Sequence, residues 1–150
     1  MACYKVSFSK QQSGFSLIEV LVALVVLSIG LLGIAGLQLT GLKFVHNANL
    51  VYQASLQASD MADRIRANSV GLNSGSYNNL SGTGADPGCI QSSCTPNQLA
   101  ATDRFEWNTA NAQLLPSGAG TVVGVNGNFT ITVSWTEQVP AGSVARSYIL

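Results

Sequence analysis

The chain has 150 residues, room for about one domain, and only 9% of them are charged, against about 25% in typical soluble proteins. The seven basic and seven acidic side chains cancel to a formal net charge of zero, and no basic cluster stands free of neighbouring acids, so charge does not indicate a nucleic acid partner. Hydrophobic residues reach an ordinary 47%, but they are concentrated in one N-terminal run.

The first element is an apolar run, residues 15–37, behind a short basic segment. As a helix it would span about 35 Å, enough to cross a hydrocarbon core of about 30 Å. Lys5 and Lys10 precede it without any acid, which predicts that the N-terminal flank stays in the cytoplasm. The alternative is an ordinary secretory signal peptide, but the run is longer than such an apolar region and ends in no A-x-A-like cleavage site.

The boundary between these segments reads GFSLIEV, residues 14–20. A glycine ends the basic leader, an aromatic residue follows it, and a carboxylate lies inside the apolar run. This pattern resembles the class III leader of type IV pilins and pseudopilins. The resemblance implies cleavage after Gly14 by a prepilin peptidase, N-methylation of Phe15 as the mature terminus, and Glu19 as the acidic assembly residue.

The cost of a charge in a membrane bears on Glu19. A carboxylate there costs about 2.5–3.5 kcal/mol, so such residues are functional by default. After cleavage, the α-amino group of Phe15 in a neighbouring filament subunit would pair with Glu19 and set the axial register. The alternative is that Glu19, only about 6 Å along the helix from Phe15, lies at headgroup level and snorkels to water.

No helix breaker follows the apolar run. Between residues 43 and 68, small and apolar residues recur at spacings of three and four, which predicts that one helix continues to near Asn68 with an amphipathic second half. Gly71 is the expected stop. The predicted stripe consists of Phe44, Ala48, Val51, Ser55, Ala58, Ala62 and Ile65, with Leu50, Ala54 and Met61 beside it.

The predicted helix ends in MADRIRAN, residues 61–68. This run resembles the end of the first helix in minor pilins of the PilV type, also called type IV pilus modification proteins. Arg64 and Arg66 are candidate interface residues for contacts with other subunits. The alternative is a solvated helix end in which Asp60 and Arg64 form an i,i+4 pair worth a few tenths of a kcal/mol.

Residues 73–88 are rich in Asn, Ser and Gly and predict a surface loop. Cys89 and Cys94 follow it, and outside the cytoplasm such a pair is expected to form a disulfide. Zinc is the competing interpretation, but a zinc site needs more ligands, and the single histidine, His46, lies on the long helix. We therefore expect no metal and no cofactor.

The remaining segments predict a short helix and a sheet. Asp103, with a glutamate three residues later, indicates a helix start, and Pro116 prevents its extension. Residues 122–125 form an apolar run, and residues 129–136 alternate between apolar and polar. With Asn126-Gly127 between the two segments, this pattern predicts a hairpin with a type I′ turn. Residues 144–150 are expected to add a strand, and the striped helix would cover the apolar face of the sheet.

These elements predict an α+β, pilin-like fold with a long N-terminal helix on a small antiparallel sheet. The expected divisions are the cleaved leader 1–14, the membrane-spanning half-helix 15–37, the amphipathic periplasmic half-helix 38–70, and the globular domain 71–150. The resemblance implies a single-pass inner-membrane protein with a periplasmic C-terminal domain, later incorporated into the pilus fibre or its tip.

The expected function is that of a minor pilin that promotes type IV pilus assembly and supports twitching motility and adhesion. The expected partners are the prepilin peptidase, other minor pilins and the major pilin, without nucleic acid or a small-molecule substrate. A minor pseudopilin of a type II secretion system is the alternative, and an adhesive or DNA-uptake module on a pilin scaffold is a further one. The sequence contains no nucleophile–histidine–acid set and no phosphate loop, so an enzyme is not expected.

Overall fold

The computed structural model describes residues 14–139 and 142–150. Apart from Gly14, the predicted leader with Lys5, Lys10 and Cys3 lies outside the described residues. The chain divides into two compact units, one ending at Gly41 and the other spanning Leu42–Leu150.

The long helix α1 spans Leu17–Ala67, which confirms the prediction of one helix from near Phe15 to near Asn68. In the first unit every described side chain is exposed, so this half of α1 makes no core of its own. Within the described part of the chain, α1 is long and apolar enough to cross a membrane, with a mean hydropathy of 2.8 in its most apolar window.

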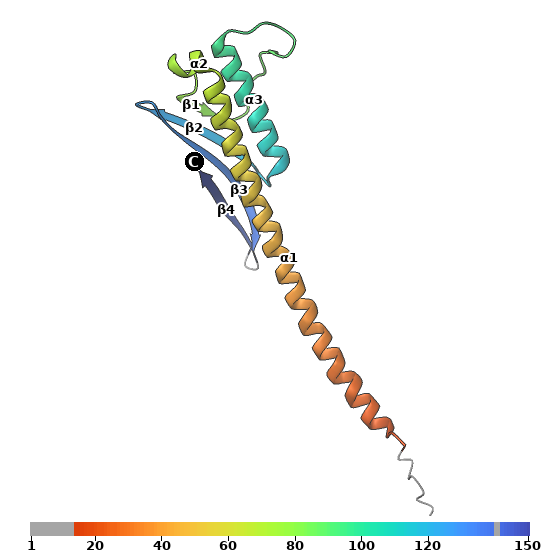
Figure 1. The fold of residues 1–150 in the computed structure, drawn as a ribbon. Helices are drawn as coiled ribbons and strands as arrows, with labels where there is room; N and C mark the ends of the chain where they lie inside the picture. Colours follow the sequence, from red (N-terminus) through yellow and green to blue (C-terminus); the bar gives the residue numbers. More distant parts are fainter. Residues whose placement is uncertain (1–13, 140–141) are drawn as a thin grey trace, which may run out of the picture. The chain divides into compact units, whose positions relative to one another are not determined.

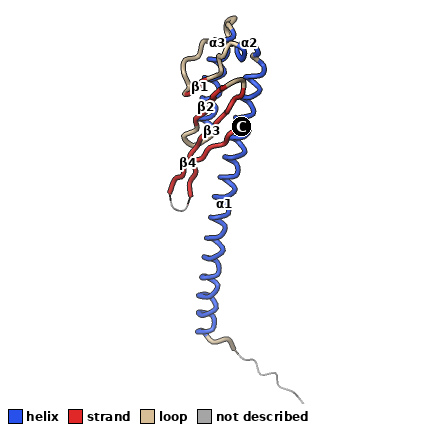
Figure 2. The backbone as a smooth tube through the Cα atoms, turned by 90° about the vertical axis from the view of Figure 1, so that its left-hand side faces the viewer, coloured by secondary structure: helices blue, strands red, loops and turns tan. Residues whose placement is uncertain are grey.

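The second unit joins the later half of α1 to two further helices and a four-stranded antiparallel sheet (Figures 1 and 2). The strands lie in the order β1-β2-β3-β4, so each pairs with its neighbour in sequence. This arrangement confirms the predicted α+β, pilin-like architecture. The elements after α1 are α2 (Ser69–Asn73), β1 (Asn79–Ser81), α3 (Pro96–Leu114), β2 (Ala119–Val125), β3 (Asn128–Val139) and β4 (Gly142–Ile149).

The hairpin of β2 and β3 forms as predicted. Val125 pairs with Asn128 around the two-residue loop Asn126-Gly127. Both loop residues have positive φ, 52° and 79°, as a type I′ turn requires. Along β3 the odd-numbered side chains face the core and the even-numbered ones face outward, which confirms the predicted alternation.

The core lies on one face of the sheet, beneath α1 and α3. The indole of Trp107 is fully buried, and its Nε1 donates a hydrogen bond to the carbonyl oxygen of Gln57 at 2.8 Å, linking α3 to α1. Gly120 lets β2 approach this indole, because a Cβ there would lie 2.3 Å from the ring. The buried apolar residues are Leu50, Ala54, Ala58, Met61, Ala62, Ile65, Tyr77, Leu80, Ala100, Trp107, Leu115, Val122, Ile131, Val133 and Trp135.

The buried face of α1 differs from the predicted stripe. Phe44 and Val51 were assigned to the stripe, but they are 70% and 44% exposed. Leu50 and Ala54, expected beside the stripe, are buried instead. The physical reason is that α1 packs against both the sheet and α3. These two contacts set the rotation of α1 about its own axis, and the periodicity of the sequence alone does not predict them.

The start of α3 also differs from the prediction. The helix begins at Pro96, with Thr95 as N-cap and Gln98 completing a capping box, and not at Asp103. Asp103 lies inside the helix and is buried. The true start carries the usual signals, a threonine followed by a proline at the first helical position.

Residues 73–88 are not entirely loop, and Gly71 is not the stop of α1. Strand β1 lies within this segment and pairs with β2 through Leu80 and Val122. The chain leaves α1 at Asn68, whose side chain accepts a hydrogen bond from the backbone of Gly71 and caps the short helix α2. The sequence pattern missed β1 because three residues are too few to show an alternation.

Candidate processing and assembly site

The Gly14–Phe15 junction lies in exposed, non-helical backbone just before α1. Phe15 is 85% exposed. A Cβ added at Gly14 would meet no atom within 4 Å, and its φ lies outside the left-handed region. Nothing in the described structure therefore requires a glycine at this position.

Glu19 lies in the first turn of α1, where its carboxylate interacts favourably with the helix dipole. Its backbone N–H bonds to the carbonyl oxygen of Ser16 at 3.0 Å, within the turn that opens the helix. The carboxylate is exposed and forms no salt bridge with any other described residue. The structure thus presents this charge outward from the helix.

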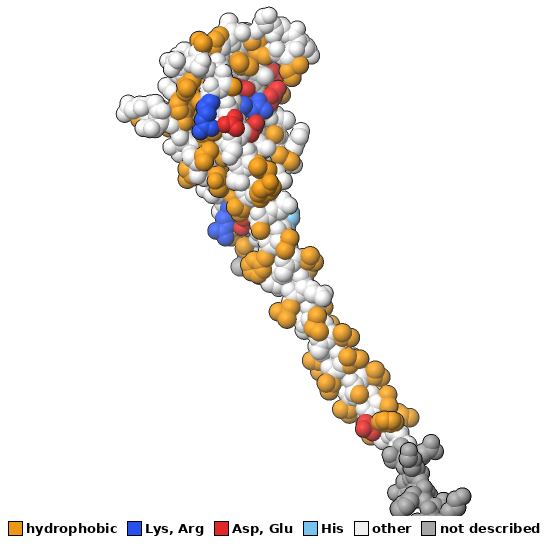
Figure 3. Space-filling model, in the orientation of Figure 1, with side chains coloured by type: hydrophobic (Ala, Val, Ile, Leu, Met, Phe, Trp, Pro, Cys, Tyr) orange, Lys and Arg blue, Asp and Glu red, His pale blue; other side chains and the backbone are white. Residues whose placement is uncertain are grey.

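Apolar side chains cover α1 from its start to beyond residue 40. Leu17, Leu32 and Leu37 are 79%, 74% and 75% exposed, and the residues between them are exposed on every side of the helix. Figure 3 shows these hydrophobic side chains along the visible face of the helix. A surface this apolar is not stable in water, so it needs a lipid environment or other helices around it.

The MADRIRAN segment brings Arg64 into a polar network inside the second unit. Its Nε donates to Asp60 at 2.8 Å on the same helix. One terminal nitrogen donates to Asp103 at 3.2 Å and to Glu106 at 2.7 Å, both on α3. Burial alone lowers the pKa of Arg64, but the hydrogen bonds to these three carboxylates raise it above its usual value. Arg64 therefore joins α1 to α3.

The network continues from Asp103 to Tyr77. The Tyr77 hydroxyl donates to Asp103 at 2.5 Å and accepts from the side-chain amide of Asn68 at 3.1 Å. Asn68 also donates to the carbonyl oxygen of Pro96 at the start of α3. Burial and the hydrogen bond to Asp103 raise the pKa of Tyr77 above its usual value, so the phenol stays protonated as the donor.

Arg66 has different surroundings from Arg64. It pairs with Asp63 at 2.8 Å on the same helix, and the two side chains are 73% and 76% exposed. Such a pair adds little to stability. Of the two candidate interface residues, Arg66 is the one that a partner could reach without breaking contacts between helices.

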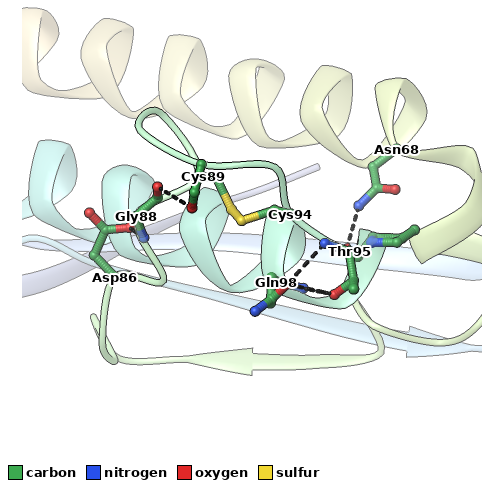
Figure 4. The surroundings of a disulfide bond; sticks show 9 residues. Asn68, Asp86, Gly88, Cys89, Cys94, Thr95 and Gln98 are labelled. Atoms are coloured by element: carbon green, nitrogen blue, oxygen red, sulfur yellow. Dashed lines mark hydrogen bonds between the residues drawn. A yellow bond between two sulfur atoms is a disulfide. The ribbon is translucent and has the colours of Figure 1, made fainter.

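The structure joins Cys89 and Cys94 in a disulfide, with their Cα atoms 5.4 Å apart. Cys94 directly precedes Thr95, the N-cap of α3, so the disulfide fixes the loop at the start of this helix (Figure 4). The Gln98 side chain accepts from the backbone N–H of Thr95, and the Thr95 side chain accepts from that of Gln98, so two of the free N–H groups there are satisfied. No group of three or more metal-binding side chains occurs among the described residues.

Comparison with known proteins identifies the N-terminal segment. A family model described as "Prokaryotic N-terminal methylation motif" matches residues 9–35. This match indicates a type IV pilin-like or pseudopilin protein, and it implies processing by a prepilin peptidase. The apolar helix fits membrane anchoring. No curated protein and no solved structure matches the chain.

Sequence reasoning missed the role of Tyr77 and the true place of Asp103. Tyr77 lies in a polar segment and gives no pattern of its own. A usable signal was present in Asn68 and Arg64, two polar residues on the core side of an amphipathic helix, because such residues require partners when buried. The identity of those partners comes only from the fold.

Proposed function

We propose that this chain is a minor pilin of the PilV type that promotes type IV pilus assembly, and thereby supports twitching motility and adhesion. The observation that carries the proposal is the Gly14–Phe15 junction and Glu19 at the start of a helix with uncovered apolar side chains. The MADRIRAN segment, residues 61–68, favours this subgroup.

In the first step, prepilin peptidase hydrolyses the peptide bond between Gly14 and Phe15. Water adds across this bond, so Gly14 leaves with a carboxylate on the leader and Phe15 keeps a free amine. The amine then takes a methyl group from a sulfonium methyl donor, which leaves as the thioether, and loses a proton. The exposed, non-helical backbone at the junction supports this step, because a protease requires an accessible segment of chain.

In the second step, the chain enters a filament through α1. The charged amine of Phe15 on one subunit pairs with Glu19 on its neighbour, where the low dielectric strengthens the attraction. The exposed apolar surface of α1 then packs against neighbouring helices instead of lipid. The absence of an ion-pair partner for Glu19 within the described chain supports a partner in another subunit.

In the membrane stage, residues 15–37 span the inner membrane, and the globular part, residues 71–150, lies in the periplasm. The globular part then contacts other minor pilins at the tip or initiation complex, with Arg66 as the accessible candidate contact. Arg64 contributes indirectly by holding α3 on α1.

The experiment is a clean deletion in the native host, complemented with wild type and with variants. Surface pili, twitching and secreted exoproteins are scored in parallel. Loss of pili with normal secretion is expected. The mature wild-type protein should begin at Phe15 and carry the added mass of one methyl group. Normal pili with trapped exoproteins would instead make this chain a minor pseudopilin of a type II secretion system, which shares the methylation motif.

Variants at Glu19 test the register. Glu19→Ala is expected to be processed normally but to fail in complementation, whereas Glu19→Asp keeps the charge and is expected to retain part of the activity. If Glu19→Ala restores pili as well as wild type does, the ion pair has no role in assembly.

If both pili and secretion are normal in the deletion, a displayed adhesive module becomes the better description.

A further inference from the structure

We infer that the outer edge of β4 is a docking site for an extended strand of another protein, one that carries apolar side chains and an acidic side chain on the face turned toward α1. β4 is the last strand of the sheet, and no other described element pairs with its outer side (Figures 1 and 2). An edge of this kind offers unpaired backbone groups to an incoming chain.

The hydrogen-bond pattern shows which backbone groups are free. Ile131 and Leu150 exchange both of their N–H and C=O bonds, at 3.1 and 3.0 Å. Because such pairs alternate along an antiparallel ladder, Tyr148, Arg146 and Val144 also bond inward to β3. The residues between them, Ser143, Ala145, Ser147 and Ile149, therefore direct their N–H and C=O groups outward.

The usual protections of a sheet edge are missing from β4. Its sequence, GSVARSYI, contains no proline and a single charged residue, Arg146. That charge does not guard the edge, because Arg146 shares the side of the sheet that faces α1 and its Nε donates to Glu137 at 3.1 Å. Natural edge strands of this length are normally blocked by charges, prolines or bulges.

A groove beside this edge supplies specificity. It has a volume of about 470 Å³ and lies between the second-unit part of α1 and the last two strands. An added strand would place alternate side chains next to Arg146 and Tyr148, over this groove. Asn47 in its wall has a buried amide oxygen without a hydrogen-bond partner among the described residues. The large and charged side chains that line the groove are Phe44, Val51, Trp135, Glu137, Arg146 and Tyr148.

The positive charge of Arg146 in the groove favours an incoming strand that carries an acidic side chain. The Arg146 side chain is 52% exposed, and its hydrogen bond to Glu137 uses only one of its five N–H groups. A carboxylate on the incoming strand would use the others. A second copy fits poorly, because its own β4 carries no acid and its β1 has only three residues. The proposed occupant is therefore a strand of a different protein.

The test uses the full chain, labelled with ¹⁵N in detergent micelles, and a short acetylated peptide that alternates valine and threonine with one central valine replaced by glutamate. Binding is followed by fluorescence anisotropy, and hydrogen exchange by NMR. In the free protein the amides of Ala145 and Ser147 are expected to exchange fast and that of Arg146 slowly. The peptide is expected to slow exchange at the outward amides, such as those of Ala145 and Ser147, and to leave that of Arg146 unchanged.

Ala145→Pro is the decisive variant, because it removes an outward N–H group and leaves the bonds to β3 in place. It is expected to weaken binding by at least about tenfold, whereas Ala145→Thr, which keeps the N–H group, changes it little. Should Ala145→Pro fold poorly, the wild-type protein is tested with a peptide N-methylated at alternate amides, which should lose affinity equally. A lysine in place of the peptide's glutamate is expected to weaken binding several-fold.

Three results would overturn the inference. One is the absence of peptide binding to the wild-type chain. Another is equal affinity for wild type and Ala145→Pro, which would place the peptide elsewhere. The third is self-association of the wild-type chain in sedimentation that Ala145→Pro abolishes, because the edge would then be occupied by a second copy.

Discussion

Replacement of Arg64 by methionine tests whether the MADRIRAN segment stabilises the fold. The variant keeps the length and helix propensity of the side chain but removes all its hydrogen bonds. It leaves the Asp103 carboxylate with the Tyr77 hydroxyl as its remaining side-chain hydrogen-bond donor, and it leaves Glu106 and Asp60 without their cationic partner.

The expected loss in the free energy of unfolding follows from how exposed the three carboxylates are. Asp103 has a side chain only 10% exposed, so it bears most of the cost, whereas Glu106 and Asp60 are 35% and 47% exposed and regain water. Loss of one partner from a fully buried pair costs about 3–5 kcal/mol, and an exposed pair is worth about 0.2–1 kcal/mol. Because Arg64 itself is 29% exposed, we expect a loss of about 2 kcal/mol in the free energy of unfolding.

The assay is urea unfolding of the full chain at constant detergent, followed by tryptophan fluorescence. Both tryptophans, Trp107 and Trp135, are buried in the second unit, so the signal reports on that unit alone. Arg66→Met is the matched control and is expected to cost less than about 0.5 kcal/mol, since its ion pair is exposed.

A double-mutant cycle with Asp103→Asn tests the source of the effect. The asparagine removes the charge that Arg64 compensates, so Arg64→Met should cost about 1 kcal/mol less in this background. The reasoning fails if Arg64→Met is no more destabilising than Arg66→Met, or if the two changes at Arg64 and Asp103 are strictly additive.

Three further changes act on the same unit. The raised pKa of Tyr77 means that folding favours the protonated phenol. Its contribution to stability is complete below the unfolded pKa of about 10 and declines as pH rises above that value toward the higher folded pKa. Urea unfolding from pH 8 to 11 should show the start of this decline, and Tyr77→Phe should abolish it. Reduction of the Cys89–Cys94 disulfide should lower the free energy of unfolding by about 2 kcal/mol in urea titrations. Gly120→Ala should cost about 1–3 kcal/mol, because the new Cβ overlaps the ring of Trp107.

Each of these changes has a control on the same unit. Tyr148→Phe lies at a partly exposed position and should leave the alkaline drop in place. Thr121→Ala, on the exposed face of β2 next to Gly120, should change stability by less than about 0.5 kcal/mol. A disulfide-free variant, Cys89→Ser with Cys94→Ser, should be as stable with reductant as without it. Equal losses in test and control variants would contradict the assigned contacts.

The sequence predicted the elements whose signal is local and repeated. The apolar run and the small-residue period predicted α1, and the Asn126-Gly127 turn with the alternation after it predicted the β2–β3 hairpin. The Gly14, Phe15 and Glu19 pattern was readable for the same reason, since it is a short contiguous motif. These features do not depend on where the chain returns in space.

What the sequence did not predict depends on contacts between distant residues. Asp103 looks like a helix cap from its neighbours alone, and only the positions of Tyr77 and Arg64 show it as a buried acceptor. The orientation of α1 about its axis depends on Trp107, fifty residues from its partner Gln57. Strand β1 is defined by the register of β2 and not by its own three residues.

The buried residues of α1 begin at Leu50, and this boundary has an evolutionary consequence. Substitutions well before it, in the first unit that ends at Gly41, do not alter the packing of the second unit, so selection on that stretch operates through whatever surrounds the helix. Substitutions at the buried positions after it are filtered by folding. A lineage could thus exchange the first stretch for that of another filament system while it keeps the same head. Variation along this single helix should therefore fall into two regimes, with the change near the first buried leucine.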